Sequence, residues 1–272
     1  MNRARRWMMA GLVGWPLLLS PLLLPQPASA QGRPLSPQVL DLPRPNGAVQ
    51  RVLLSVPANA RGMIVMLPGG AGDVGIGRDG AIAHGDNFVV RTRALWNARG
   101  YGVLIPDALG SDNMRGRRSS PGYARVVGDL VALAHRQVGG PVFLLGTSQG
   151  SIAAMNGASH AAPGSVAGVV LTESVSVLGG SHETVFDADP ARVRVPALVV
   201  ANRDDACNVA PPDDAPRIAA AMTHSPDVKI LTVSGGVTRS DKACGSLTPH
   251  GYYGIEGQVV DGIVRWMDAH SR

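Results

Sequence analysis

Residues 146–150 read Gly-Thr-Ser-Gln-Gly, a G-x-S-x-G pentapeptide. An apolar run of strand length, 141–145, precedes it, and a run of small, helix-compatible residues, 152–158, follows it. This order predicts a buried strand, a sharp turn and a helix, with Ser148 at the apex of the turn. Glycines on both sides of the serine suit such a turn, because its backbones approach too closely for a Cβ. Ser148 is therefore a candidate nucleophile. An ordinary strand-to-helix turn is the alternative.

Apolar segments of strand length alternate with amphipathic helical patterns along most of the chain. We expect strands at 39–42, 50–56, 63–67, 102–106, 141–145, 166–172, 197–201 and 228–233. Helices are expected from Asp86 or Asn87 to Gly100, and at 121–138, 152–158, 215–222 and 255–267. This alternation predicts an α/β fold with a doubly wound, mostly parallel sheet that is covered by helices on both faces.

The first two of these strands differ from the others, because a Pro- and Gly-containing turn joins them directly. We expect them to be antiparallel and to lie at one edge of the sheet. No internal repeat or low-complexity linker interrupts residues 31–272, so we expect a single domain. Ligands of such sheets bind outside the carboxyl ends of the strands, where Ser148 is expected.

The first 30 residues have the pattern of a secretory signal peptide. Three arginines occur among the first six residues, an uncharged Leu-rich run spans 7–24, and Ala-Ser-Ala ends at Ala30. We expect cleavage after Ala30 and a secreted or periplasmic protein. A membrane anchor is the alternative, but it needs about 20 apolar residues, and two prolines interrupt this run.

The charge of the chain changes when this leader is removed. The full sequence has 25 Lys and Arg against 20 Asp and Glu, and the leader holds three of the arginines, which leaves 22 against 20. A net charge of +2 and an aromatic content of 4% give no support for a nucleic-acid partner. We also expect no stable membrane anchor after cleavage.

The chain contains two cysteines, Cys207 and Cys244. Export into an oxidising compartment favours a disulfide between them, and two free thiols are the alternative. No C-x-x-C motif or Cys/His cluster indicates zinc, and we expect no metal and no organic cofactor.

A serine nucleophile needs a base, and histidine is suited to that role because imidazole titrates near neutral pH. His250 lies in a loop between the last strand and the last helix, and such a loop returns to the carboxyl edge of the sheet. We therefore predict His250 as the base. His84, in the long loop before the Asp86 helix, is the alternative.

An acid that orients the histidine should follow a neighbouring strand. Asp204 and Asp205 follow the strand at 197–201, and we favour Asp205. Glu173, which ends the preceding strand, is a rival. The predicted order along the chain is serine, acid, histidine. A bridge between the two cysteines would join the turn of the acid to the loop of the histidine.

The oxyanion of an acyl-transfer reaction needs aimed donors. We expect one to be the backbone N–H of Gln149, which follows the serine. The other should come from the glycine-rich loop after Leu67, with Gly70 as first choice and Ala71 as second. A plain turn is the alternative for that loop.

Four motifs together resemble the α/β hydrolase superfamily: L-P-G-G-A-G, G-T-S-Q-G, R-D-D-A-C and H-G-Y-Y-G-I-E. The resemblance covers about residues 50 to 270 and is nearest to exported bacterial hydrolases with no assigned substrate. It implies Ser148 as nucleophile, Asp205 as acid and His250 as base. Pro68 stands where lipases commonly have a histidine, which argues against a lipase.

The resemblance also indicates where a cap domain would be inserted, namely after the strand that follows the helix at 152–158. Only about 20 residues, 174–194, are available there, so we expect no large cap domain and an open site. Small-molecule and polymeric acyl substrates would both have access to it. Three arginines in the loop before Ser120, at 115, 117 and 118, would suit an anionic substrate, but we expect a solvated loop.

These features predict an exported serine hydrolase that cleaves carboxylic esters through an acyl-enzyme on Ser148. An amide or peptide hydrolase, or an acyltransferase, could use the same residues. A non-catalytic binding protein on the hydrolase fold is a further alternative. The sequence does not specify the acyl group, the alcohol or the oligomeric state.

Overall fold

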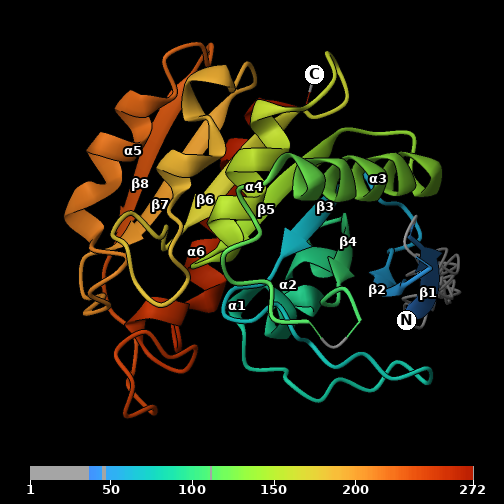
Figure 1. Ribbon diagram of the computed structural model, residues 1–272, viewed down its shortest axis with the longest axis horizontal. Helices are drawn as coiled ribbons and strands as arrows, with labels where there is room; N and C mark the ends of the chain where they lie inside the picture. Colours follow the sequence, from blue (N-terminus) through green and yellow to red (C-terminus); the bar gives the residue numbers. More distant parts are fainter. Residues whose placement is uncertain (1–36, 45–46, 111, 272) are drawn as a thin grey trace, which may run out of the picture. The chain divides into compact units, whose positions relative to one another are not determined.

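Eight strands form one sheet within the residues that the computed structural model describes, 37–44, 47–110 and 112–271 (Figure 1). The strands are β1 (Gln38–Pro43), β2 (Val49–Ser55), β3 (Gly62–Leu67), β4 (Tyr101–Pro106), β5 (Val142–Thr147), β6 (Gly168–Thr172), β7 (Ala197–Asn202) and β8 (Val228–Val233). Their order across the sheet is β1-β2-β4-β3-β5-β6-β7-β8. The predicted signal peptide, 1–30, lies outside the described residues.

The sheet is antiparallel at one edge and parallel elsewhere. β1 pairs with β2 and β2 with β4 in antiparallel register, whereas β4, β3, β5, β6, β7 and β8 run parallel. Every residue of β3 to β7 is buried, as expected for continuous apolar strands that are covered on both faces. The predicted doubly wound, mostly parallel α/β fold is therefore confirmed.

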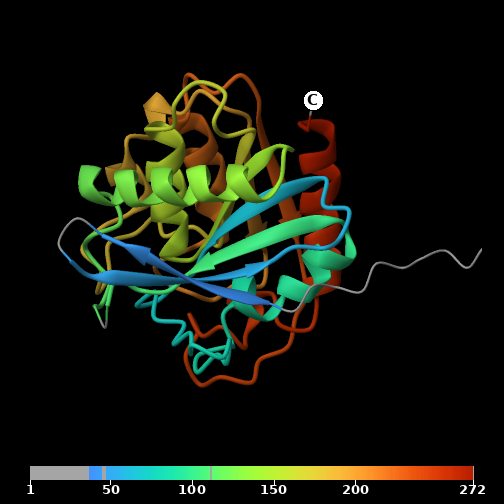
Figure 2. The same ribbon diagram turned by 90° about the vertical axis from the view of Figure 1, so that its right-hand side faces the viewer.

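Helices cover the two faces of the sheet. The buried residues of α3 (Pro121–Gln137), α4 (Gly150–Ser159) and α5 (Ala215–Ala221) belong to one hydrophobic cluster. Those of α1 (Phe88–Arg91), α2 (Arg93–Ala98) and α6 (Glu256–Ala269) belong to the other. Figure 2 shows α3 and α4 on one side of the strands and the C-terminal helix α6 on the other.

The helix expected from Asp86 or Asn87 to Gly100 is divided in two at Thr92. The Thr92 hydroxyl donates to the Phe88 carbonyl at 2.6 Å and accepts from Trp96 Nε1 at 3.0 Å. A buried hydroxyl that bonds back to the preceding turn competes with the helical hydrogen bonds. This competition accounts for the break, which the apolar pattern of the segment does not reveal.

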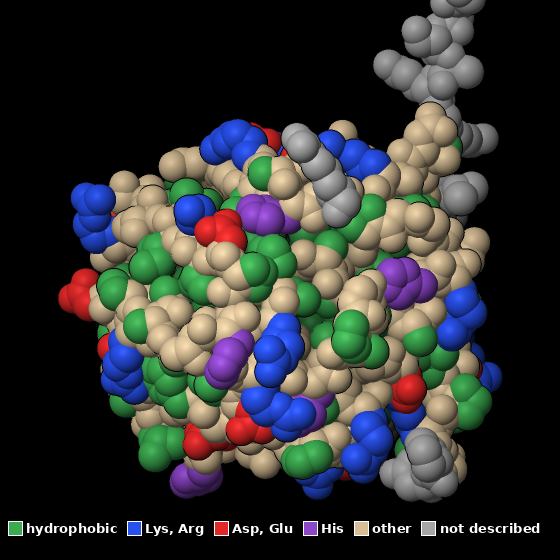
Figure 3. Space-filling model, turned by 90° about the horizontal axis from the view of Figure 1, so that it is seen from above, with side chains coloured by type: hydrophobic (Ala, Val, Ile, Leu, Met, Phe, Trp, Pro, Cys, Tyr) green, Lys and Arg blue, Asp and Glu red, His purple; other side chains and the backbone are tan. Residues whose placement is uncertain are grey.

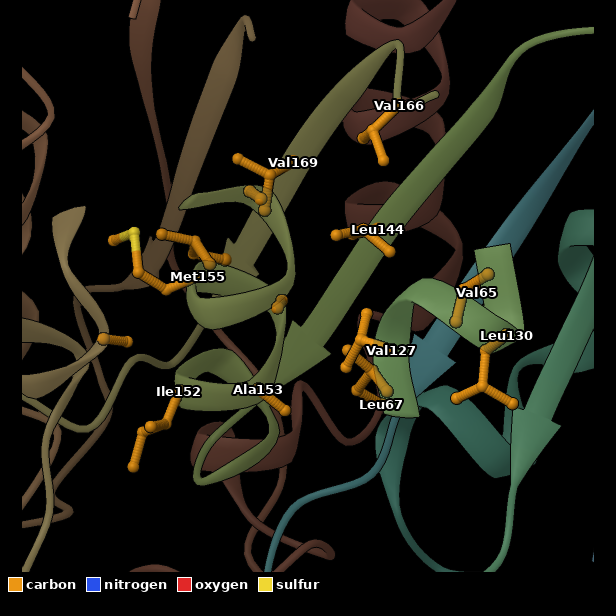
Figure 4. Packing of buried hydrophobic residues seen from close by; sticks show 14 of the residues in the cluster. Val65, Leu67, Val127, Leu130, Leu144, Ile152, Ala153, Met155, Val166 and Val169 are labelled. Atoms are coloured by element: carbon orange, nitrogen blue, oxygen red, sulfur yellow. The ribbon is translucent and has the colours of Figure 1, made fainter. Parts of the chain in front are cut away.

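Helix α4 begins directly after Gln149, the residue that follows Ser148, and is fixed between α3 and the sheet. A Cβ at Gly157 would lie 2.4 Å from Cγ1 of Val127, so only glycine permits this approach of α4 to α3. Val127 and Leu130 of α3 belong to the same hydrophobic cluster as labelled residues of β3 and β5. Figure 4 shows this cluster, with Val65, Leu67 and Leu144 on the strands. A close-packed core of this kind holds the start of α4 rigidly.

The segment between β6 and β7 forms two short 3-10 helices, η1 (Val185–Ala188) and η2 (Pro190–Arg192), and no cap domain. In the described part of the chain, no helix is long and apolar enough to cross a membrane. On the face seen from above in Figure 3, basic side chains are scattered among other residues and do not form one continuous patch among the residues described.

Candidate active site

The site lies where the winding direction of the sheet reverses. The chain passes from β3 outward to β4, and then returns to β5 on the other side of β3. The loops that follow β3 and β5 therefore leave the sheet in different directions, which opens a crevice at the carboxyl ends of these strands. Ser148 comes directly after β5, and the glycine-rich loop 68–72 comes directly after β3.

Ser148 occupies a tight turn with φ of +52°, a conformation that costs energy for a residue other than glycine. A Cβ at Gly146 would lie 2.1 Å from the Gly150 carbonyl oxygen. A Cβ at Gly150 would lie 2.0 Å from the carbonyl oxygen of Leu67. Both glycines of the pentapeptide are therefore sterically required, and the turn holds the serine partly exposed at the edge of the sheet.

Ser148, His250 and Asp205 form one hydrogen-bonded chain. His250 Nε2 lies 3.0 Å from Ser148 Oγ, and His250 Nδ1 lies 2.7 Å from Asp205 Oδ2. Because a carboxylate can only accept, Nδ1 donates to Asp205 and Nε2 is left to accept the serine proton. His250 and Asp205 are both buried. The structure thus brings together the three residues that the sequence nominated.

The short 3-10 helix η4 (Pro249–Gly251) positions His250. The hydroxyl of Thr248 accepts the backbone N–H of His250 at 3.1 Å and donates to the carbonyl of Gly245 at 2.8 Å. The same threonine therefore caps the histidine turn and fixes the loop that leads into it.

The two adjacent aspartates after β7 have different surroundings. Asp205 accepts the backbone N–H of Cys207 at 2.8 Å through the oxygen that does not face His250. Asp204 is exposed, and its carboxylate accepts the backbone N–H of Gly235 at 2.6 Å. Asp204 therefore holds a neighbouring loop and does not contact the histidine.

Glu173, the other rival for the acid, is buried beside Asp205 with φ of +45°. One carboxyl oxygen accepts the backbone N–H of Asn202 at 3.0 Å, and the other has no hydrogen-bond partner among the described residues. Burial, followed by the adjacent Asp205 carboxyl, raises the pKa of Glu173 well above its ordinary value. The surroundings of Glu173 therefore favour its protonated form over the carboxylate.

Ligand atoms of Glu173, Asp205 and His250 lie within 4.8 Å of one another, a spacing that could hold a metal ion. Asp205 and His250 already bond each other, however, and burial disfavours the ionised form of Glu173 that a cation would need. The chemistry of this set favours proton transfer between Ser148 and His250 over the binding of a cation.

Cys207 and Cys244 form the predicted disulfide. Cys207 is two residues after Asp205, and Cys244 is six residues before His250. The covalent link therefore joins the turn of the carboxylate to the loop of the imidazole.

A cavity of about 340 Å³ lies over Ser148. Its lining includes Ser148, His250, Gly70 and Ala71, whereas Gln149 lies outside it. In the described part of the chain, the backbone N–H groups of Gly70, Ala71 and Gln149 donate to no protein acceptor. They are thus available to a ligand, and Gly70 has φ of +58°, which turns the loop sharply beside the cavity.

The lining of this cavity mixes polar and apolar groups. His84, the alternative base, lines it together with Asp73, and its Nδ1 lies 3.3 Å from the Asp73 carboxylate. Asp86 and Asn87 contribute further polar groups. His84 is therefore part of the wall, while His250 is the histidine bonded to Ser148.

Three features of the site were not anticipated from the sequence. Asp107, at the end of β4, accepts the backbone N–H groups of residues 74–76 and so anchors the chain that follows the glycine-rich loop. In the sequence, the signal for this role was the position of Asp107 directly after the expected strand 102–106. Glu173 is a buried carboxyl beside the acid, and burial raises its pKa. Arg118 is 1% exposed, so the expectation that the whole arginine loop is solvated is wrong for this residue.

Known structures of similar fold include several hydrolases. A dienelactone hydrolase from Anabaena variabilis superposes with a TM-score of 0.58 at 16% identity, over 87% of this chain and 99% of its own. The Pyrococcus furiosus esterase Pf2001 gives 0.58 at 13% identity, over 85% and 91%. An acylaminoacyl peptidase from Pyrococcus horikoshii gives 0.59 at 9% identity, over 88% and 42%. No protein-family model and no curated protein sequence matches the chain.

Proposed function

Given the α/β-hydrolase fold of this chain, we propose that the protein is an exported serine hydrolase that cleaves carboxylic esters. The observation that carries the proposal is the hydrogen-bonded chain from Ser148 through His250 to Asp205. Nucleophile, base and orienting acid are within hydrogen-bond reach of one another, which is the geometry that covalent acyl transfer requires.

In this mechanism, Ser148 Oγ attacks the acyl carbonyl while its proton passes to His250 Nε2. Asp205 orients the imidazole and stabilises its cation. The backbone N–H groups of Gln149 and Gly70 (or Ala71) stabilise the tetrahedral oxyanion. Collapse of the intermediate breaks the bond to the alcohol, which leaves with the proton from His250. Water then repeats the sequence and releases the acid.

Two observations favour short acyl groups on polar alcohols. The cavity above the serine is small and has charged or amide side chains on its wall, including Asp73, Asp86 and Asn87. No cap domain covers this crevice among the described residues, so a bulky alcohol has access from outside. A small-molecule or a polymeric ester satisfies these conditions.

Labelling with a fluorophosphonate tests the nucleophile. We expect the wild-type protein to be labelled and Ser148→Ala to resist labelling and to lose ester hydrolysis. Ser246→Ala is the matched control, because Ser246 lines the same cavity and should keep both properties. Equal labelling of wild type and Ser148→Ala would refute the proposal.

A panel of aryl esters of increasing acyl length, with the matching anilides, tests the substrate class. We expect kcat/KM to be highest for short esters and to fall with chain length. Faster turnover of the anilides would instead identify an amidase, and product formation only with an added alcohol would identify an acyltransferase. Mass spectrometry of protein exported by a bacterial host should show a chain that begins at Gln31.

A further inference from the structure

Arg118 is a buried cation whose guanidinium forms no salt bridge with a carboxylate among the described residues. Its side chain is almost fully enclosed, and no Asp or Glu oxygen lies within 4.0 Å of the guanidinium among the described residues. Burial lowers the pKa of its guanidinium. Burying an unpaired charge costs free energy, so we expect Arg118 either to stabilise the surrounding loops or to serve the function of the site.

The guanidinium bonds to the two segments that supply the candidate oxyanion donors. Nη2 donates to the carbonyl of Pro68 at 3.3 Å, and Pro68 begins the loop that contains Gly70 and Ala71. Nη1 donates to Oε1 of Gln149 at 3.3 Å. One planar side chain therefore spans both walls of the crevice beside Ser148.

The loop after β3 is shaped around this side chain. A Cβ at Gly72 would lie 2.9 Å from Arg118 Nη2, so the loop encloses the guanidinium closely. The backbone of Arg118 is itself fixed, because its N–H donates to Glu183 at 3.2 Å and its carbonyl accepts from the buried Asn156 amide at 2.8 Å. The cation is thus held in one position before any substrate arrives.

The neighbouring arginines of the same loop have other surroundings. Arg117 is exposed and pairs with Asp112 at 2.6 Å. Arg115 is exposed as well, although its guanidinium lies 3.8 Å from the position of a Cβ on Gly70. Only Arg118 contacts both candidate donor segments.

We propose that Arg118 is a positioning residue of the oxyanion hole. Its guanidinium holds the Pro68 loop and Gln149 at the spacing that two converging N–H donors need, and it places a fixed positive charge behind them. This inference rests on the proposed hydrolase function. Charge that develops on the substrate oxygen is stabilised most by dipoles and cations that need no rearrangement in a site of low dielectric.

The test compares Arg118→Met, which retains most of the apolar stem, with Arg118→Lys, which retains the charge without the two-sided contact. Arg117→Met is the matched control. Fluorophosphonate titration counts the active sites in each preparation, so that turnover is expressed per intact site. We expect kcat per site to fall about 10- to 100-fold in Arg118→Met, less in Arg118→Lys, with KM within threefold of wild type.

Inhibition by a phenylboronic acid, a tetrahedral mimic of the intermediate, gives the second readout. Its Ki should rise in proportion to the loss of kcat, because both depend on the N–H donors that Arg118 positions. An unchanged kcat per titrated site, or a rise in KM alone, would overturn the proposal. If Arg118→Met fails to fold, Arg118→Lys and Gln149→Leu replace it in the test. Each single variant must then lower kcat per site. The fold-decrease in kcat of the double variant must be smaller than the product of the two single decreases. Absence of labelling in the wild type would instead refute the hydrolase function itself.

Discussion

Removal of the Cys207–Cys244 disulfide should weaken both the fold and the site. The bridged residues are 37 positions apart. The chain-entropy model gives about 4 kcal/mol for a loop of that length. A domain of 150–250 residues loses roughly 2–4 °C of Tm per kcal/mol, so we expect a fall of roughly 8–16 °C in Cys207→Ala/Cys244→Ser.

The same change should lower activity at temperatures where the variant is still folded. Cys207 donates its backbone N–H to Asp205, and the loop of Cys244 leads into the cap of His250. Without the bridge, the acid and the base are held only by hydrogen bonds on two separate loops. Since a displacement of about 1 Å can cost about 100-fold in rate, we expect kcat per titrated site to fall at least about tenfold.

Thermal unfolding by circular dichroism and ester hydrolysis at 15 °C would measure the two effects. Wild type treated with a reductant should behave like the double variant, and the double variant should not respond to the reductant. A double variant with the wild-type Tm would refute the entropic reasoning. If Tm falls by the expected amount but kcat per site is unchanged, the hydrogen bonds alone hold the acid and the base in register.

Two further predictions concern the carboxylates near His250. Asp205→Asn should lower kcat about 10⁴-fold, because an amide no longer fixes the imidazole tautomer, whereas Asp204→Asn should stay within threefold of wild type in the same ester assay. Glu173→Gln keeps the size of the side chain but cannot ionise. In the wild type the folded state holds this proton more tightly than the unfolded state, so the native protein loses stability as pH rises above the ordinary glutamate pKa near 4.5. The Tm of Glu173→Gln should therefore exceed that of wild type at pH 8 and approach it at pH 4; an equal difference at both values would contradict a buried neutral carboxyl.

The strands and the nucleophile turn could be predicted because their signals are local. Continuous apolar runs define β3 to β7, and the glycines around Ser148 are required by contacts within a few residues of the turn or with the adjacent strand. The break at Thr92 could not be predicted, because whether its hydroxyl bonds backward depends on burial of Trp96 against the sheet.

The candidate site was predictable in its chain order but not in its surroundings. Asp205 could be favoured over Glu173 only from its distance to the end of a strand, and the contact with His250 settles which of the two faces the imidazole. Arg118 and Arg117 are adjacent and chemically identical, so no sequence pattern distinguishes the buried arginine from the solvated one. That difference arises only when α4 and the loop after β3 enclose one of them.

The three residues of the hydrogen-bonded chain are spread widely along the polypeptide. His250 is 102 positions from Ser148 and 45 from Asp205. A nascent chain that has folded through β6 carries the serine with neither its base nor its acid, and only the loop beyond β8 completes the set. Synthesis proceeds from the N-terminus, so Ser148 lacks its hydrogen-bond partner His250 until nearly the whole chain has emerged. The proposed acyl transfer therefore cannot begin before the loop beyond β8, which carries His250, has been made.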